Sequence, residues 1–424
     1  MEPPDCQSTD ELARRVMLRC DELAGCTEEP GRVTRRFLTD ATRVAHDRLS
    51  EWMRDAGLAV EVDNAGNLIG RRPSATADRV LLIGSHIDTV PGAGRYDGVL
   101  GVLIGLAVAE MVKDQALPFG LEIIAFSEEE GVRFSKPYLG SSAVAGCFDN
   151  HWLDRIDGEG VTLAGALGNF GCEPLQIDSA AYDPQRVIGY VEPHLEQGPV
   201  LEQGGSPVGV VSGIVGQSRL RVEVLGESGH AGTTPMAGRK DALVAASRLV
   251  AAVREAAAST PDLHATVGKI EATPNAPNVI PERVELSLDV RHPHDAEREG
   301  AVFRLLERGQ HLAAEEGCGF RVLEHAEQPA VSVDPSLTDA LAGAIDQCGH
   351  EALRLASGAG HDAVVMASRF PSAMLFVRHP GGVSHHPDER VDECDVAVAI
   401  RVMRGLIERI GVQVQSEQIA GAAP

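Results

Sequence analysis

A histidine and an aspartate, His86 and Asp88, stand directly after the apolar run at 80–83. That run is typical of a buried strand, and residues two positions apart in an extended chain point the same way. A metal-bound imidazole is commonly oriented by a carboxylate at its second nitrogen, so the pair could supply a metal ligand and its orienting group. Asp97 follows a turn rich in proline and glycine, at the start of a helix predicted over 97–113, where it could cap the helix or bridge two cations.

Three further apolar runs, predicted as strands, end in polar loops of the same kind. The runs cover 121–126, 187–191 and 373–377, and the loops that follow them cover 127–131, 192–198 and 378–389. The first loop contains Glu128, Glu129 and Glu130, which repel one another unless cations neutralise them; a solvated acidic loop is the alternative. Strands that alternate with helices predict an open α/β sheet, whose ligands bind beyond the carboxyl ends of the strands. The four loops are therefore expected to converge.

The composition favours a small-molecule ligand. The 424 residues include 62 acidic and 38 basic residues, and the formal net charge of −24 repels nucleic acid and anionic membranes. A chain of this length predicts two domains. Residues 1–25 carry scattered charges without the apolar core of a signal peptide, and no run reaches the length of a membrane span. The eight cysteines form no CxxC pair, which predicts reduced thiols and a cytoplasmic location.

The pattern changes between the third and the fourth of these strands. Residues 213–328 contain alternating segments at 219–225, 284–290 and 320–324 and helical patterns at 241–258 and 296–316. Their order predicts β-α-β-β-α-β, an inserted α+β layer of ferredoxin-like type. The predicted fold is thus an α/β domain, 1–212 with 329–424, that has an open mixed sheet flanked by helices, and a second domain at 213–328.

Seven segments resemble, in order and spacing, the hydantoinase/carbamoylase-type amidohydrolases of the dinuclear metallopeptidase superfamily. They are GSHIDTVPGAGRYDG, FSEEEGVRF, EPHLEQGPVLE, GHAGTTPM, PNVIP, SGAGHDA and GGVSHHPDE, and the resemblance covers residues 10 to 412 approximately. It implies a dinuclear aminopeptidase-like domain with two divalent ions, Mn²⁺ or Zn²⁺, and an inserted lid that also forms a homodimer. It assigns one ion to His86, Asp97 and His194 and the other to Asp97, Glu130 and His385, so that Asp97 bridges the two ions. It also implies that Glu129 is the general base and that Asp88 orients His86.

The resemblance also implies which residues contact the substrate. His230 and Asn278 correspond to groups that polarise the scissile carbonyl and stabilise its oxyanion, and Arg291 corresponds to a clamp on the substrate carboxylate. Each has a structural alternative. His230 lies in a glycine-rich turn, Asn278 could form an Asx turn, and Arg291 could be a surface residue of a strand.

Three further residues are candidates for the same pocket. Gln197 matches a residue close to the substrate in the carbamoylases. Arg219 ends a Gly-Gln-Ser-Arg stretch that resembles one in allantoate amidohydrolases, where the arginine faces the substrate. His361 precedes Asp362 at a predicted helix start and is expected beside the metal ligands, with N-capping by Asp362 as the alternative.

The residue types support this chemistry independently of the resemblance. Imidazole and carboxylate ligands suit Zn²⁺ or Mn²⁺, and a carboxylate can bridge two cations about 3.5–4 Å apart that acidify a water between them. Glu129 could take that proton and pass it to a leaving nitrogen. We therefore expect an amidohydrolase that cleaves a ureido C–N bond beside a carboxylate. By resemblance the best match is allantoate, with ureidoglycine, ammonia and carbon dioxide as products.

Several alternatives stay open. An N-carbamoyl-L-amino acid hydrolase or a ureidoglycolate amidohydrolase would use the same residues. A dipeptidase or aminopeptidase is more distant, because such relatives usually carry an acidic ligand where this chain has His194. A non-catalytic binding module is disfavoured because every matched position is intact. Whether His230, Asn278 and Arg291 serve the site of their own subunit or that of a partner is left open.

Overall fold

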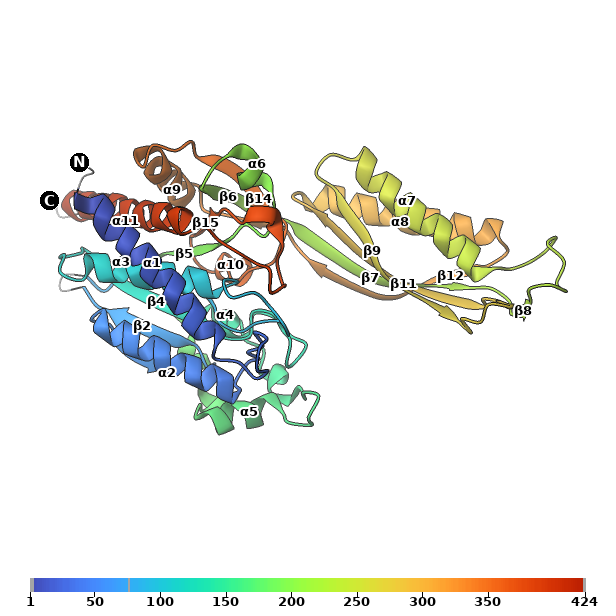
Figure 1. Cartoon of the computed structure of the whole chain (residues 1–424), viewed down its shortest axis with the longest axis horizontal. Coiled ribbons are helices and arrows are strands. Elements are labelled where there is room, and N and C mark those ends of the chain that lie inside the picture. The colour runs from blue at the N-terminus through green and yellow to red at the C-terminus, as the bar shows by residue number, and fades with distance from the viewer. Residues whose placement is uncertain (1–3, 75–76, 422–424) are drawn as a thin grey trace. The chain divides into compact units, whose positions relative to one another are not determined.

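The computed structural model describes residues 4–74 and 77–421. The chain forms two compact units (Figure 1): the larger unit, Met1–Ser212 with Ser332–Pro424, and the inserted unit, Gly213–Val331. Each unit has a hydrophobic core of its own. Among the helices of the described residues, none combines the length and the apolar character needed to cross a membrane.

The larger unit is built on a nine-stranded sheet. Its strands are β1 (Ala59–Val62), β2 (Leu68–Arg72), β3 (Val80–His86), β4 (Gly120–Phe126), β5 (Val187–Leu195), β6 (Val208–Ile214), β13 (Val331–Ser332), β14 (Leu353–Ser357) and β15 (Ser372–Val377). The order is β1-β2-β4-β3-β5-β15-β6-β13, with β14 paired to β6. The strands β4, β3, β5 and β15 are parallel, whereas β2 and β6 pair with them in antiparallel fashion. The predicted open mixed sheet is confirmed, and the four strands that end in polar loops form its parallel centre.

Helices pack around this sheet. They are α1 (Pro4–Ala24), α2 (Asp40–Asp55), α3 (Val99–Val112), α4 (Leu139–Val144), α5 (Leu163–Phe170), α6 (Val200–Gly204), α9 (Pro335–Gln347), α10 (Ala363–Met366) and α11 (Glu393–Gly421), with 3₁₀ turns η1 (Asn150–Asp154), η2 (Pro174–Ala180) and η3 (Pro380–Gly382). Helix α3 is apolar on all sides because it contacts β3, β4 and β5 as well as α1 and α11. Gly101 permits its approach to β5, since a Cβ there would lie 1.9 Å from the carbonyl oxygen of Pro193.

Helix α3 begins two residues later than predicted, at Val99. Gly98 has a φ of 65°, a conformation that glycine adopts without strain, and it separates Asp97 from the helix. A Cβ at Gly98 would also lie 2.6 Å from the ring of His86. Asp97 therefore does not cap α3, which was one of the two alternatives, and its carboxylate is available to the histidines of the loops.

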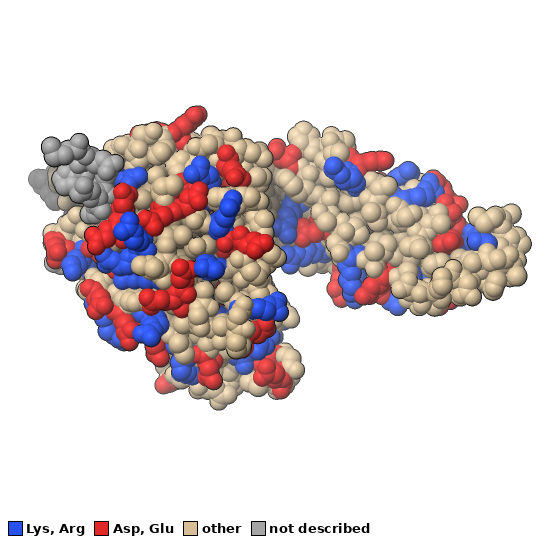
Figure 2. Space-filling model, viewed as in Figure 1, with Lys and Arg blue, Asp and Glu red and all other residues tan. Residues whose placement is uncertain are grey.

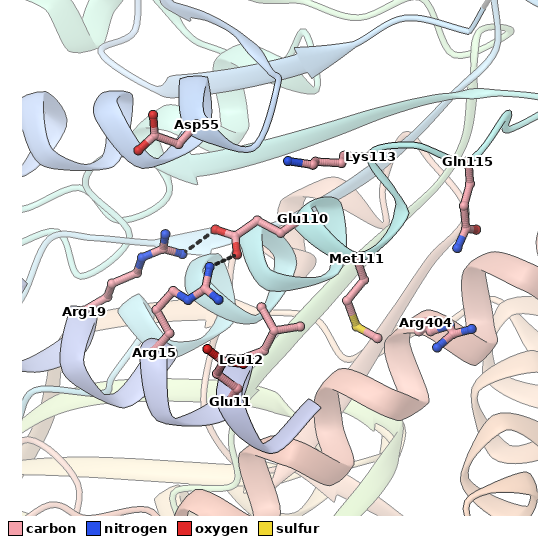
Figure 3. A pocket seen from close by; sticks show the side chains of 10 residues that line it. All are labelled: Glu11, Leu12, Arg15, Arg19, Asp55, Glu110, Met111, Lys113, Gln115 and Arg404. Carbon is pink, nitrogen blue, oxygen red and sulfur yellow. Dashed lines mark hydrogen bonds and ion pairs between the residues drawn. The ribbon is translucent and has the colours of Figure 1, made fainter. Parts of the chain in front are cut away.

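A pocket of about 520 Å³ lies at the far end of α3 (Figure 3). There the carboxylate of Glu110 accepts hydrogen bonds from Arg15 and Arg19 of α1, at 2.9 and 2.7 Å. These ion pairs join α1 to α3 and neutralise part of the charge of the pocket. The helical rise between Val99 and Glu110 separates this pocket from Asp97 by roughly 15 Å.

The inserted unit is a four-stranded antiparallel sheet covered by two helices. Its elements are β7 (Gly216–Leu225), β8 (Gly229–His230), α7 (Ala242–Ser259), β9 (His264–Thr273), β10 (Val279–Ile280), β11 (Arg283–His292), α8 (Asp295–Glu315) and β12 (Gly319–Gln328). The sheet order is β12-β7-β11-β9, and β8 pairs with β10 beyond the end of this sheet. Alternate residues of β7, among them Leu220 and Val222, form the core with α7 and α8.

The other alternating set of β7 is polar. Glu223, although buried, forms ion pairs with Arg283 and Arg321 of the neighbouring strands, and Arg221 pairs with Glu324. Figure 2 shows acidic and basic side chains interspersed over the visible face of each unit. The face of the sheet that lacks helices is therefore covered by paired charges instead of apolar side chains.

Candidate metal centre

Loops after four parallel strands meet at the carboxyl edge of the larger unit's sheet. Two groups of possible ligand atoms have all their members within 4.8 Å of one another: His86 with Asp97 and His194, and Asp97 with Glu130 and His385. Two overlapping groups add neighbours, namely His86 with Glu129 and Glu130, and Glu192 with His194 and His361. The five side chains expected to bind metal thus lie together, although about 300 residues separate the first of them, His86, from the last, His385.

Asp97 lies between the two groups. Its Oδ1 is 3.3 Å from Nε2 of His194, and its Oδ2 is 3.2 Å from Nε2 of His385. The same nitrogen of His385 is 3.4 Å from Oε1 of Glu130. The rings of His86 and His194 are stacked, with centroids 5.7 Å apart. A carboxylate that directs one oxygen toward each group has the arrangement required of a bridging ligand.

Asp88 connects His86 to the acidic loop that follows β4. Its two carboxylate oxygens accept hydrogen bonds from the backbone N–H groups of Glu129 and Glu130, at 3.0 and 3.1 Å. Nδ1 of His86 lies 3.0 Å from the backbone carbonyl oxygen of Asp88 and 3.6 Å from Oδ1 of its carboxylate. Asp88 is thus placed to orient the His86 ring, and it also fixes the backbone of the two glutamates.

Only two of the three consecutive glutamates face the cluster. Glu128 has a φ of 51°, which turns its side chain back into its own loop. There its Oε1 accepts hydrogen bonds from the backbone N–H groups of Arg133 and Phe134, at 2.9 and 3.1 Å. The repulsion expected among three carboxylates is therefore reduced to that between Glu129 and Glu130, which both lie beside His86.

The pKa values of the clustered residues are shifted in different directions. Burial raises the pKa of Glu130 to about 7 and holds that of Glu129 well above its ordinary value. Burial lowers the pKa of His194 to about 4, whereas the hydrogen bond to Asp97 raises that of the half-exposed His385 to about 8. For Asp97 itself, burial acts to raise the pKa, but the hydrogen bond with His385 and the nearby imidazoles hold it below the ordinary value.

This set of donors fits divalent metal. Three imidazoles and two carboxylates are the ligands that Zn²⁺ and Mn²⁺ accept. Nε2 of His194 is buried and has no hydrogen-bond partner, which a structural histidine would be expected to have. Cations would satisfy that nitrogen and offset the charge of carboxylates that burial otherwise disfavours.

Gln197 and His361 lie against this cluster. Gln197 has a φ of 56°, and its Nε2 donates to both oxygens of Asp97, at 3.1 and 3.2 Å, and to Oγ of Ser384 at 2.9 Å. His361 is buried behind His194, with ring centroids 4.4 Å apart, and its Nε2 lies 2.7 Å from Oγ of Ser357. The side chain of Asp362 makes no capping hydrogen bond to α10.

His230 and Asn278 are neighbours at one end of the inserted unit. Val279 pairs with His230 across β8 and β10, and the backbone oxygen of Asn278 accepts a hydrogen bond from Ala231 at 2.9 Å. Nδ1 of His230 accepts from the backbone N–H groups of Gly232 and Thr233, at 3.1 and 3.2 Å. A ring nitrogen that accepts leaves the proton of a neutral imidazole on Nε2, so His230 presents an N–H donor from an exposed position.

Arg219 and Arg291 converge on one carboxylate of the same unit. Arg291 binds Asp289 through Nε at 2.8 Å and through Nη2 at 2.9 Å, and Nε of Arg219 lies 3.4 Å from Oδ2. Gln217 donates to the same oxygen at 2.8 Å. The register of β7 and β11 pairs Asp289 with Arg219 and Arg291 with Gln217. The four side chains therefore share one face of the sheet.

Sequence reasoning did not single out several residues of the cluster. Glu192 is buried, and its carboxylate accepts hydrogen bonds from Ser85 and from the backbone of Ala363. Arg35 is buried beneath the loop that follows β3, where its Nε donates to the carbonyl of Ile87 at 2.7 Å. Glu389 accepts hydrogen bonds from the backbone of Asp97. Glu192 lies in β5, which extends to Leu195 and so includes the start of the segment predicted as a polar loop, and Glu389 lies in the loop after β15. Both could have been found by their residue type, whereas no sequence signal marks Arg35.

Comparisons with known proteins agree with this geometry. Residues 82–409 match the model of peptidase family M20/M25/M40. The chain is 38% identical to an N-carbamoyl-L-amino acid amidohydrolase of Geobacillus stearothermophilus over 92% of this chain and 96% of that protein. It is 36% identical to an allantoate deiminase of Arabidopsis thaliana, over 92% and 80% of the two chains. A crystal structure of a hydantoinase/carbamoylase family amidase from Burkholderia multivorans superposes with a TM-score of 0.86 at 33% identity and covers 93% of this chain and 97% of that chain.

The parallel sheet and the cluster at its carboxyl edge define a hydrolase that uses divalent metal. The chain belongs to peptidase family M20/M25/M40, within which it resembles the hydantoinase/carbamoylase-type amidohydrolases. The family resemblance and the α/β fold class with a central mixed sheet, both inferred from the sequence, are thereby confirmed.

Acidification should remove metal from the group of Asp97, Glu130 and His385 first. Metal binds a neutral imidazole and an ionised carboxylate, so below the pKa values of about 8 for His385 and about 7 for Glu130 it must displace protons. Each displaced proton lowers the apparent affinity about tenfold per pH unit. In the group of His86, Asp97 and His194, burial acts to lower the pKa of His86 but the neighbouring carboxylates hold it above its ordinary value, while His194, with a pKa of about 4, is already neutral. That group therefore displaces one proton where the group of His385 and Glu130 displaces two. Metal content, measured at fixed free metal between about pH 8 and about pH 5.5, should fall in two steps; loss in a single step would contradict this prediction.

Proposed function

We propose that the protein is a dinuclear amidohydrolase that cleaves a ureido C–N bond beside a carboxylate, with Mn²⁺ or Zn²⁺ in both positions, and that its substrate is allantoate. The observation that carries the proposal is the position of Asp97, with one oxygen near His194 and the other near His385. The names of the relatives, which are amidohydrolase, deiminase and amidase, support the hydrolysis of a C–N bond.

The reaction requires a base and a held substrate beside the ions. When bound, the two ions would polarise the ureido carbonyl and lower the pKa of a water at the site. Glu129 takes the proton from that water as the oxygen attacks the carbonyl carbon, and it returns the proton to the nitrogen when the C–N bond breaks. Burial raises the pKa of Glu129, which makes it a stronger base for this transfer. The hydrogen bond from its backbone to Asp88 fixes its position.

The choice of allantoate rests on the two arginines of the inserted unit. One arginine is enough for the carboxylate that every candidate substrate carries, and a planar guanidinium suits that contact. Allantoate has a second ureido group, whose carbonyl needs donors of its own, and Arg219 lies on the same face as Arg291. An N-carbamoyl-L-amino acid with an apolar side chain would gain nothing from Arg219. It is the second candidate because of the relative from Geobacillus stearothermophilus.

The distances within the inserted unit support a homodimer with shared sites. His230 and Asn278 lie beyond the end of the sheet where Leu225 pairs with Arg283, whereas Arg219 and Arg291 lie near its other end (Figure 1). Six residues of extended chain between Arg219 and Leu225 span about 20 Å, which is longer than a ureido carboxylate. One substrate therefore cannot contact both pairs of the same chain, and we propose that His230 and Asn278 serve the site of the partner subunit.

Glu129→Gln and Glu130→Gln should have different effects. The first variant keeps its shape but cannot accept a proton, so kcat should fall by about 10²-fold or more while metal is retained. The second removes a ligand charge and should lower metal content. Activity and metal content of both variants, measured on the same preparations, test this prediction. If Glu130→Gln kept its metal and Glu129→Gln lost it, the two roles would have to be exchanged.

The substrate is tested with a panel of allantoate, ureidoglycolate, N-carbamoyl-L-methionine, N-carbamoyl-β-alanine and a dipeptide. We expect kcat/KM for allantoate to exceed that for the two N-carbamoyl amino acids by at least about 10²-fold, the scale seen when a polar site meets an apolar analogue. Arg219→Leu should remove most of this preference without loss of metal. Arg221→Leu is the matched control, because Arg221 lies two residues further along the same strand and pairs with Glu324. Equal turnover of N-carbamoyl-L-methionine by the unmodified protein would favour the second candidate.

Mixed dimers test whether His230 acts in the partner's site. His230→Ala and Glu129→Gln chains, each inactive alone, should recover about a quarter to a half of the normal activity when they form heterodimers, because one of the two sites is then intact. Chains with Glu129→Gln and Glu130→Gln are the control, since both residues belong to one cluster and no site is restored. Verified heterodimers without recovered activity would show that His230 acts in its own subunit.

A further inference from the structure

Glu389 is a buried carboxylate that holds the backbone of Asp97. Its Oε1 accepts hydrogen bonds from the backbone N–H groups of Tyr96 and Asp97, at 2.8 and 3.0 Å. Glu389 is only 4% exposed, and its Oε2 is buried without a hydrogen-bond partner. Burying a second carboxylate beside Asp97 is costly, and the two backbone hydrogen bonds offset part of that cost.

The same residue belongs to the loop that carries His385. The backbone N–H of Glu389 donates to the carbonyl of His386 at 3.0 Å, which closes the turn after His385. His385 has a φ of 57°, and its side chain is 46% exposed, more than that of any other member of the two groups. The hydrogen bond from Gln197 to Ser384 holds the start of this loop, and the hydrogen bonds to Glu389 hold its end. The distance between His385 and Asp97 therefore depends on Glu389.

A glycine makes this contact possible. A Cβ at Gly94 would lie 2.4 Å from Cβ and Cδ of Glu389, closer than such atoms approach in real structures. Gly94 does not have a positive φ, so the absence of a side chain is required by the approach of Glu389 and not by the backbone conformation. The loop after β3 is thus shaped to receive this carboxylate.

We propose that Glu389 is a positioning residue that fixes Asp97 relative to His385 and thereby sets the metal affinity of the group formed by Asp97, Glu130 and His385. The inference rests on the proposed function, because it takes this group as a metal site. Residues that orient metal ligands from behind typically affect metal affinity by about 10- to 100-fold. The affinity of this group should change most, because it loses the fixed position of both Asp97 and His385, whereas the other group shares only Asp97 and its His86 and His194 lie in β3 and β5.

The test is a metal titration of the full chain that resolves two bound ions per chain. The first equivalent is the ion held by His86, Asp97 and His194, and the second is the ion held by Asp97, Glu130 and His385. Glu389→Ala should weaken the second equivalent by about tenfold or more and the first by less, and excess metal should restore kcat without a change in KM. Glu389→Gln keeps an oxygen that can accept both hydrogen bonds and should remain within about threefold of the unmodified protein. Gly94→Ala should reproduce the effect of Glu389→Ala, because it displaces the carboxylate without removing it.

Two controls separate this role from a general loss of structure. Asp388→Ala changes the preceding residue, whose side chain is 83% exposed and pairs with His386 of the same loop, and it should leave both equivalents unchanged. His385→Ala tests the metal group itself, and an unchanged second equivalent in that variant would overturn the assignment of the site. Loss in His385→Ala without loss in Glu389→Ala or Gly94→Ala would overturn the positioning role alone. Equal weakening of both equivalents in Glu389→Ala would also overturn it.

Discussion

Buried carboxylates must be neutralised, and this constraint governs the carboxyl edge of the larger unit's sheet. Asp88, Asp97, Glu129, Glu192 and Glu389 are all nearly inaccessible to solvent, and four imidazoles, those of His86, His194, His361 and His385, lie among the clustered carboxylates. Hydrogen bonds from backbone N–H groups satisfy part of this charge, as they do for Asp88 and Glu389. The remaining negative charge, on Asp97, Glu129 and Glu130, lies close to His86, His194 and His385. A site of this composition is suited to divalent cations, which supply the charge that the protein does not.

The fold supplies the rigidity that such a site requires. The carboxyl ends of β3, β4, β5 and β15 lie side by side because these strands are parallel neighbours, and their spacing is fixed by backbone hydrogen bonds. Helix α3 is packed against the same strands so closely that Gly101 has no room for a Cβ. Asp97 follows β3 and precedes this helix in the chain, so both elements fix its position. Small displacements of either element would change the distances to His194 and His385, which makes the packing part of the site.

The inserted unit contributes chemistry of another kind. Its polar residues are arranged in two places, with His230 and Asn278 at one end and Arg219 and Arg291 at the other. Asp289 binds both arginines and Gln217, so the guanidinium groups are oriented before any substrate arrives. Hydrogen-bond donors that are already in position lose less conformational entropy on binding. In the proposed function, this face would distinguish allantoate from an N-carbamoyl amino acid with an apolar side chain, and the metal cluster would act on the ureido C–N bond that both substrates carry.

The types of the ligands and the segments that carry them can be predicted from local sequence patterns. Apolar runs such as 80–83 and 121–126 predicted buried strands, and the polar residues directly after them, among them His86 and Glu130, marked the edge where they would meet. Local pattern is sufficient there, because strand periodicity and the exit direction of the chain are properties of neighbouring residues. Which polar side chains face the cluster depends instead on how the chain folds. Glu128 is directed away by its positive φ, Asp97 is excluded from α3 by Gly98, and Arg35 and Glu389 reach the site from segments more than fifty and nearly three hundred residues distant. Those placements depend on contacts between segments far apart in the chain, and no local sequence pattern specifies them.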